Sequence, residues 1–436
     1  MAHLNVRARN YNRTHEGASA VPALKPEAQL RRLVLSCLLW EDQFYVDGKE
    51  IATQIAEAAA QVSPQKLADI AVQARSIQNL RHAPLWLIET LTKTGAGDKL
   101  VADTIVNVVQ RADELSELLA VHWKGGKRPI PAQMRKGLAR AFAKFSEYEL
   151  AKYDRDGAIK LRDVLRLVRP RPESDEQSAL YKRVKERQLQ TPDTWEVALS
   201  GGADKKETFE RLLREGQLGY LALLRNLRNM VNAKVDEDLV IDAIRARKGA
   251  RRVLPFRYVA AARAAPLFEA ALDEALQAAI AEMKPLSGRT IVLVDVSGSM
   301  DMRLSGKSDM TRMDAAAALG AIVPGQLRVL TFSNKTVEVP ARRGMAGVEA
   351  IIRSQAHGGT MMGDAVETVN ELKHDRLIVI SDEQSHQSVP DPVADKAYMI
   401  NVASYQNGVG YGRWTHLDGW SENVIRFIQA LESVES

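Results

Sequence analysis

The stretch IVLVDVSGSM, residues 291–300, constrains the fold more than any other part of the chain. Four consecutive apolar residues lead into Asp295, and hydroxyl side chains follow at Ser297 and Ser299. A short β-branched run that ends in a polar turn predicts a buried strand that delivers a loop at its carboxyl end. Open α/β sheets bind their ligands at this edge. The loop offers one carboxylate and two hydroxyls, and such hard oxygen donors suit Mg2+, Mn2+ or Ca2+.

Two downstream stretches add oxygen donors of the same kind. HGGT at residues 357–360 presents a threonine on a glycine turn, and LIVISD at residues 377–382 is an apolar strand that ends in an aspartate. Together the loops resemble the metal-ion-dependent adhesion site of von Willebrand factor A (VWA) domains, in which five such residues hold one divalent cation. The resemblance implies a site for Mg2+, or for Mn2+ or Ca2+, formed by Asp295, Ser297, Ser299, Thr360 and Asp382. The alternative, that these are only polar ends of strands, is disfavoured by their order and spacing.

From residue 287 onward, strands and helices alternate, which predicts a largely parallel, doubly wound sheet. We expect strands at residues 291–295, 328–332, 336–339, 377–380 and 397–403, and helices at 313–323, 348–354, 364–372 and 422–432. No G-x-G-x-x-G follows the first strand, so no dinucleotide is expected. Gly306-Lys307-Ser308 lacks the first glycine of a phosphate-binding loop, so NTP hydrolysis is not expected either.

Residues 26–282 have a different pattern, in which apolar residues recur three and four places apart. Short breaks at glycine, proline and Ser-Pro separate segments of about 10 to 17 residues, which is typical of antiparallel helix pairs. No strict sequence repeat is visible. We expect an α-solenoid of HEAT-like helix pairs, with a compact all-α domain as the alternative.

Charge is distributed unevenly along the chain. Residues 1–290 carry 47 Lys and Arg against 37 Asp and Glu, whereas residues 291–436 carry 13 against 18. The segment 121–171 alone carries 14 against 5. A basic first part joined to an acidic second part indicates a polyanion partner for the first.

This basic segment is expected to place cations in rows on two helices. Residues 133–153 are predicted to form one helix, and residues 161–168 form a second helix after a short turn. Charges about 6 Å apart along a helix axis match the spacing of successive phosphates, so the rows predict contact with RNA or DNA. The alternative is two solvated helix faces, which the scarcity of acidic residues one turn away disfavours. The predicted RNA-contacting residues are Lys136, Arg140, Lys144, Arg162, Arg166, Arg169 and Arg171.

The sequence gives little support for an enzyme. Its eight histidines are scattered and none forms H-E-x-x-H. Ser297 does not lie in G-x-S-x-G, and Asp382-Glu383 beside Asp295 would suit a two-metal nuclease only with more carboxylates. The single cysteine, Cys37, lies in an apolar run, so we expect no disulfide and a reducing, cytoplasmic location. No apolar run approaches the roughly 20 residues that span a bilayer.

A basic helical half followed by an adhesion-type metal domain resembles the TROVE family, which is named for telomerase, Ro and vault proteins. The stretches that carry the resemblance to the bacterial relatives of the Ro autoantigen are EGA at 16–18, KLRDVLRLVRPRP at 160–172, LLRNLRNM at 223–230 and VLPFR at 253–257. The chain departs from the family pattern at Arg169, where relatives often have a histidine. This puts a histidine-specific contact in doubt but not phosphate binding.

The resemblance implies a TROVE domain of HEAT-like repeats at residues 1–285, which closes into a ring, and a Rossmann-like VWA domain at residues 286–436. It further implies a non-catalytic RNA-binding scaffold. Its partners would be small noncoding Y-like RNAs, the 3′ ends of misfolded or immature RNAs, and a 3′-to-5′ exoribonuclease such as polynucleotide phosphorylase. The alternative function is a metal-dependent protein-interaction adapter with a helical solenoid.

Overall fold

The computed structural model describes residues 3–4, 26–37, 49–94, 99–154, 157–191, 193–304, 310–382, 385, 387–402, 413–418 and 423–435. The chain divides into two compact units. The helical unit consists of Val21–Asp193 with Arg426–Ser436, and the sheet unit consists of Met1–Ala20 with Thr194–Ile425. The EGA stretch at 16–18 and Gly306-Lys307-Ser308 lie outside the described residues.

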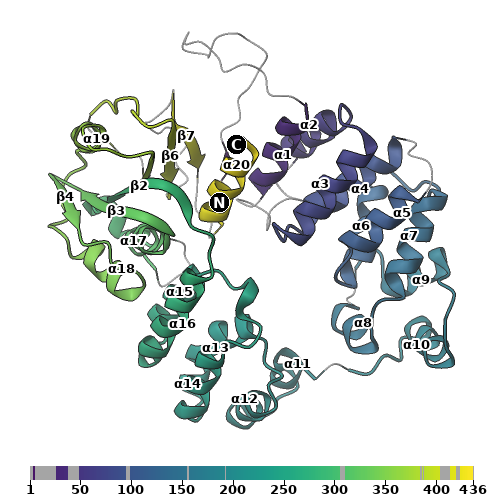
Figure 1. The fold of residues 1–436 in the computed structure, drawn as a ribbon. Coiled ribbons are helices and arrows are strands. Elements are labelled where there is room, and N and C mark those ends of the chain that lie inside the picture. The colour runs from purple at the N-terminus through teal and green to yellow at the C-terminus, as the bar shows by residue number, and fades with distance from the viewer. Residues whose placement is uncertain are drawn as a thin grey trace. The chain divides into compact units, whose positions relative to one another are not determined.

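The helical unit contains a succession of short helices (Figure 1). Their bounds are α1 Pro26–Ser36, α2 Lys49–Ala59, α3 Pro64–Ser76, α4 His82–Lys93, α5 Leu100–Val108, α6 Asp113–His122, α7 Ala132–Phe142, α8 Glu147–Tyr153, α9 Leu161–Val168 and α10 Asp175–Glu186. Helix α3 packs against α4, α5 packs against α7, and α9 packs against both α7 and α10. The apolar positions three and four places apart line these contacts, and Leu67, Ile70 and Ala74 of α3 are all buried. The predicted α-helical first half is confirmed.

The single helix predicted at residues 133–153 is wrong, because the chain forms α7 and α8 with a break between them. Ser146 begins α8 with a capping box. Its hydroxyl accepts from the backbone N–H of Glu149 at 3.3 Å, and the Glu149 carboxylate accepts from the backbone N–H of Ser146 at 2.9 Å. This reciprocal pair satisfies N–H groups that a new helix start leaves open. The Ser-x-x-Glu signature was visible in the sequence, but the apolar periodicity continued through it.

The sheet unit begins with further helices: α11 Trp195–Ser200, α12 Lys205–Arg214, α13 Tyr220–Asn232, α14 Glu237–Ala246, α15 Phe256–Ala264 and α16 Glu269–Ala281. Helix α13 carries the LLRNLRNM stretch and starts at Tyr220 after its N-cap Gly219. Leu223, Leu224 and Leu227 are buried, whereas Leu221 is 37% exposed and does not pack into the core.

The sheet has seven strands in the order β1-β7-β6-β5-β2-β3-β4 (Figure 1). Their bounds are β1 His3–Leu4, β2 Leu286–Asp295, β3 Gly325–Phe332, β4 Thr336–Val339, β5 Arg376–Ser381, β6 Lys396–Asn401 and β7 Thr415–Asp418. The five central strands β7, β6, β5, β2 and β3 run parallel, and the edge strands β4 and β1 are antiparallel to their neighbours. The sequence prediction missed β1 and β7, which are too short to show periodicity.

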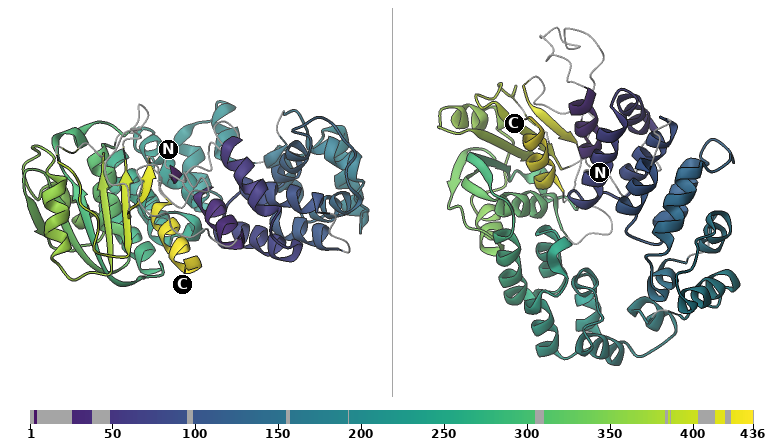
Figure 2. Two further views of the ribbon diagram at one scale, coloured as in Figure 1. Left: turned by 90° about the horizontal axis from the view of Figure 1, so that it is seen from above. Right: turned by 45° about the vertical axis from the view of Figure 1, so that its right-hand side comes forward.

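Helices cover both faces of this sheet, as expected for a doubly wound fold (Figure 2). Residues Ile291 and Leu293 of β2 pack in one cluster with α19 (Met362–Asn370). Val292 and Val294 point to the other face, toward α17 (Arg312–Ile322), where Gly320 allows close approach. Helices α18 (Met345–Ile352) and α20 (Val424–Glu435) complete the described elements. The predicted VWA-type sheet is therefore confirmed.

Ion pairs and a hydrogen bond connect helices α15 and α16 to this α/β layer. Arg263 of α15 forms ion pairs with Asp314 of α17 and Glu349 of α18, both at 3.1 Å. On α16, Asp273 accepts a hydrogen bond from the backbone N–H of Met345 at 2.8 Å. These contacts explain why Thr194–Ile425 forms one unit. The boundary at residues 285 and 286 stays a prediction, as does the ring.

Candidate functional site

The predicted oxygen ligands lie at the point where the strand order reverses. The chain passes from β2 to β3 on one side and places β5 on the other side of β2. Val294 and Ile380 are partners in the parallel β2–β5 pair, so Asp295 and Ser381 leave the sheet next to each other. Sheets of this type bind ligands at such a switch point, because the loops on either side diverge there.

Asp295 is the centre of this site. Its Oδ1 accepts a hydrogen bond from the backbone N–H of Ser297 at 2.8 Å, and its Oδ2 accepts from the hydroxyl of Ser381 at 2.6 Å. The side chain is fully buried. Burial raises the pKa of Asp295 to about 6, the hydrogen bonds oppose the rise, and the negative charge of Asp382 adds to it.

The Ser297 and Ser299 hydroxyls lie 3.3 Å apart on the loop after β2. Ser297 is buried, and Ser299 is partly exposed at the mouth. The following residues, Gly298–Asp301, form a single 3-10 turn. The two hydroxyls therefore lie close together on the loop that the sequence predicted after this strand.

The loop that carries Thr360 is attached directly to the Asp295 loop. The backbone N–H of Gly298 donates to the carbonyl of Gly358 at 3.1 Å, and Nδ1 of His357 donates to the carbonyl of Val296 at 2.8 Å. Thr360 itself is buried. Gly358 is required here because a Cβ at this position would overlap the side chain of Asn334.

A second tether comes from the residues after β3. The hydroxyl of Ser333 accepts from the N–H of Gly358 at 2.7 Å and donates to the carbonyl of Gly359 at 3.1 Å. Asn334 accepts from the N–H of Gly359 at 2.7 Å. The threonine loop is thus fixed by two neighbouring strand ends. The structure brings the loops of all five predicted ligands to one edge of the sheet.

A cation from the protein itself also reaches this edge. Arg312, the first residue of α17, has its guanidinium 3.6 Å from the buried carboxylate of Asp382. Two buried carboxylates and three hydroxyls fit a hard divalent cation, since a cation offsets the repulsion between Asp295 and Asp382. The described residues contain no group of three or more His, Cys, Asp or Glu side chains suited to a metal. Among its five predicted ligands, the site around Asp295 contains only two side chains of these types, Asp295 and Asp382, and its other oxygens belong to hydroxyl groups.

The cations predicted to contact RNA fall into two classes. Arg140 forms an ion pair with Asp103 of α5 at 2.5 Å. Lys144 donates to the carbonyls of Val106 and Val109 at 2.6 and 2.5 Å, so it caps the end of α5. Burial lowers the pKa of Lys144. Both residues therefore have structural partners that the sequence did not reveal, and their contact with RNA stays a prediction.

The remaining residues that the sequence predicted to contact RNA have fewer partners within the protein. Arg162 is partly buried and lies 3.8 Å from the carboxylate of its neighbour Asp163. Four others are exposed and form no ion pair within the described part of the chain: Lys136, Arg166, Arg169 and Arg171. These four lie on α7, on α9 and directly after α9, and the two helices pack against each other. These exposed cations of two neighbouring helices are called the basic surface of α7 and α9.

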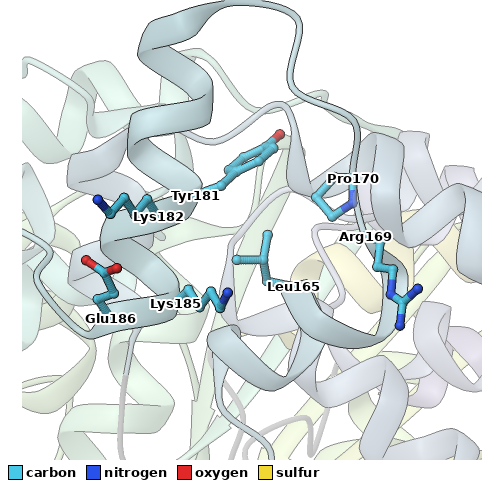
Figure 3. Close-up of a pocket in the computed structure, with 7 residues that line it drawn as sticks. All are labelled: Leu165, Arg169, Pro170, Tyr181, Lys182, Lys185 and Glu186. Atoms are coloured by element: carbon cyan, nitrogen blue, oxygen red, sulfur yellow. The ribbon is translucent and has the colours of Figure 1, made fainter.

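A pocket of about 410 Å3 extends this surface onto α10 (Figure 3). It is lined by Leu165, Arg169, Pro170, Tyr181, Lys182, Lys185 and Glu186. Tyr181 is 8% exposed, and its hydroxyl has no hydrogen-bond partner among the described residues. Arg169 adopts a left-handed backbone (φ +49°), which ends α9 and turns the chain into Pro170. The pocket thus combines an unsatisfied phenol with three cations and one carboxylate.

Comparison with known protein families agrees with this architecture. The TROVE domain model matches residues 175–303, and the model for a VWA domain containing CoxE-like protein matches residues 271–397. The chain therefore contains one region that is similar to TROVE domains and one that is similar to VWA domains. The crystal structure of the Deinococcus radiodurans RO (RSR) protein matches with a TM-score of 0.70 at 17% sequence identity. The match covers 94% of this chain and all of that one, and at this identity it establishes a shared fold.

Sequence reasoning missed several residues of the two candidate sites. Ser381 was visible as the hydroxyl next to Asp382 in LIVISD, but its bond to Asp295 depends on strand register. Arg312 gave no signal, because its neighbour at the site is 70 residues away. Lys182 and Lys185, three places apart beside Tyr181, could have been found as a further cationic row on α10.

Proposed function

We propose that this protein is a non-catalytic RNA-binding scaffold. It would bind small noncoding Y-like RNA and the 3′ ends of misfolded or immature RNA, and would support RNA maturation, quality control or decay. The observation that carries the proposal is the basic surface of α7, α9 and α10. On it, exposed cations without ion-pair partners in the described part of the chain surround a pocket that contains the unsatisfied Tyr181 hydroxyl.

The exposed cations of this surface have no carboxylate partners in the described part of the chain, and this distinguishes them from other exposed cations of the protein. Arg245 and Arg289, for example, are exposed but held by Glu274 and Asp375 at 2.8 and 3.0 Å. A cation already paired gains little from a phosphate, whereas an unpaired cation releases counterions from the RNA when it binds. The α7–α10 surface is therefore the place where a polyanion gains most.

The pocket adds a feature that charge alone does not provide. Arg169 supplies a planar fork that suits phosphate oxygens, and Lys182 and Lys185 supply point charges. A phosphate or a base edge at the pocket would satisfy the Tyr181 hydroxyl, which otherwise is buried at a cost of about 1–3 kcal/mol. RNA binding thus accounts for both the charges and the phenol.

The five oxygen ligands of the VWA domain would hold one divalent cation, Mg2+ in preference to Mn2+ or Ca2+. Asp295 and Asp382 would supply the charge, and Ser297, Ser299 and Thr360 would supply neutral oxygens. When bound, the ion provides an open position for an oxygen of a partner. The protein's own tethers, from Ser381, Ser333 and His357, hold the loops in place for it.

Filter binding of purified full-length protein to a structured RNA with a single-stranded 3′ tail tests the RNA claim. We expect binding at low salt that weakens steeply as salt increases. Absence of affinity at low salt would refute the proposal. If the RNA is shortened by the protein alone, and EDTA stops the shortening, the non-catalytic part of the proposal is wrong.

A second candidate function, a metal-dependent protein-interaction adapter, is favoured by one observation. The Asp295 loop and the Thr360 loop are fixed to each other before any partner binds, which suits capture of an acidic side chain. Its partner could be an exoribonuclease such as polynucleotide phosphorylase. Loss of a co-purifying protein on Asp295→Ala, with no change after RNase treatment, would support the adapter.

A further inference from the structure

The helical unit contains a second pocket, of about 270 Å3, which is lined by none of the cations of the α7–α10 surface. It lies between α4, the end of α6 and the turn that follows α6. The residues that line it combine an aromatic ring, four basic side chains and a glycine pair with one carboxylate: Trp86, Glu89, Lys93, Val121, His122, Lys124, Gly125, Gly126 and Arg128.

The floor of this pocket is a buried polar pair. Glu89 and His122 are each 3% exposed, and Nδ1 of His122 lies 2.9 Å from the Glu89 carboxylate. The other ring nitrogen of His122 lies 3.1 Å from the carbonyl of Pro129. Arg128 and Lys93 also form ion pairs with Glu89. The Arg128 guanidinium further lies 3.4 Å from Nδ1 of His122, so these side chains form one polar network beneath the pocket.

The charge of the pocket is consequently positive. Glu89 supplies one negative charge, whereas Lys93, Lys124 and Arg128 supply three positive charges. The Lys93 and Arg128 side chains are 60% and 45% exposed, and their charged ends contact Glu89. The backbone of Arg128 is fixed as well, since its carbonyl accepts from the indole of Trp123 at 2.8 Å.

The pocket also has a flat apolar wall. The ammonium of Lys124 lies 4.4 Å from the centroid of the Trp86 ring, so the ring face already accommodates a charged group. Lys124 precedes Gly125 and Gly126, and a Cβ at either glycine would meet nothing within 4 Å. The turn therefore has room to move Lys124 off the ring without a clash.

We infer that this pocket binds one nucleotide unit, with the base against Trp86 and the phosphate at Lys124. An anion alone would need the cations but not the ring, and an apolar ligand would need the ring but not the cations. A volume of about 270 Å3 is of the size of a single nucleotide rather than of several. That this nucleotide belongs to an RNA strand rests on the proposed function, whereas binding of a free nucleotide does not.

Titration calorimetry of full-length protein with adenosine 5′-monophosphate tests the inference, with inorganic phosphate and an oligoadenylate as the other probes. Stacking of a base on an aromatic ring contributes about 1–3 kcal/mol. Trp86→Leu is therefore expected to weaken the monophosphate roughly 5- to 150-fold. Lys124→Gln is expected to weaken it about tenfold, and inorganic phosphate should bind more weakly than the monophosphate in the wild-type protein.

Trp195→Leu is the matched control, because it removes a partly exposed tryptophan from α11 and should leave binding unchanged. Lys124 is exposed, so Lys124→Gln keeps the fold even if Trp86→Leu does not. Equal affinity for phosphate and monophosphate, or no effect of Lys124→Gln, would overturn the inference. Monophosphate binding without oligoadenylate binding would support the pocket and count against RNA as its source. RNA binding that depends only on the α7–α10 surface, with no monophosphate binding, would overturn the pocket and leave the proposed function intact.

Discussion

Neutralising the unpaired cations of the α7–α9 surface should reduce the salt dependence of RNA binding by a calculable amount. The change is a quadruple substitution to glutamine at Lys136, Arg166, Arg169 and Arg171, which form no ion pair among the described residues. Each phosphate contact contributes about 0.9 to the slope of log K against log salt on a duplex and about 0.7 on a single strand. Four contacts thus contribute roughly 2.8 to 3.6.

Between 50 and 200 mM salt, that slope corresponds to an affinity loss of roughly 50- to 150-fold. The wild-type protein should show this loss in addition to any contribution from other contacts, and the quadruple variant should lack it. Fluorescence anisotropy with a labelled structured RNA, measured at several salt concentrations, gives both slopes. The slopes would be equal if these four residues do not contact phosphate, and that result would refute the reasoning.

The matched control removes four cations that already have carboxylate partners. Arg211, Arg245, Arg289 and Arg328 form ion pairs with Glu215, Glu274, Asp375 and Glu338. Their substitution by glutamine changes the net charge by the same amount, but it should leave the slope nearly unchanged. Each exposed pair contributes about 0–1 kcal/mol to stability, so the control variant should remain folded. If both variants lose the same slope, net charge rather than a defined surface governs binding.

Three further outcomes follow from the geometry. Lys144→Met should lower the free energy of unfolding by about 1.5–3 kcal/mol, because a charged donor to two carbonyls is lost. The RNA affinity of the folded protein should stay unchanged. Urea unfolding measures the stability, and fluorescence anisotropy measures the RNA affinity. Asp295→Asn combined with Asp382→Asn should abolish binding of Mn2+, observed as free Mn2+ by electron paramagnetic resonance. Arg75→Met should lower the free energy of unfolding by about 3–5 kcal/mol, because it leaves the fully buried Glu114 carboxylate without its guanidinium at 2.6 Å.

A specific result would contradict each of these three predictions. Weaker RNA binding by Lys144→Met at unchanged stability would restore the role that the sequence pattern predicted for it. Retention of Mn2+ by the double aspartate variant would place the ion elsewhere, and Asp301→Asn, on the same loop, is the control that should bind normally. If Arg75→Met unfolded at the same urea concentration as the wild-type protein, another group would have replaced Arg75 as the partner of Glu114.

The alternating pattern of the second half of the chain was sufficient to predict its sheet, because buried parallel strands are short apolar runs with polar ends. Asp295 and Asp382 could be placed on neighbouring loops for the same reason. Ser381 and Arg312 could not be recognised, since their contacts depend on strand register and on the start of a helix far along the chain. Strand β7 has only four residues, too few for a pattern.

In the helical half, periodicity located the helices but not their surface partners. The row Lys136, Arg140 and Lys144 is regular in sequence, yet Asp103 and the end of α5 engage two of its members. Charge spacing on one helix carries no information about the neighbouring helix, so the sequence could not separate available cations from structural ones. The Tyr181 pocket was missed because it forms only where α9 and α10 meet.

The most direct test of the RNA-binding claim is to locate the RNA on the protein. A structured RNA that contains 4-thiouridine in its single-stranded 3′ tail and stem would be crosslinked to the full-length protein by light. Peptides that carry crosslinked nucleotide would then be identified by mass spectrometry. RNA binding by the proposed surface predicts crosslinks within residues 160–190, which contain α9, Tyr181 and the lysines of α10. Crosslinks confined to the VWA domain, or none above those of a protein without RNA affinity, would contradict it.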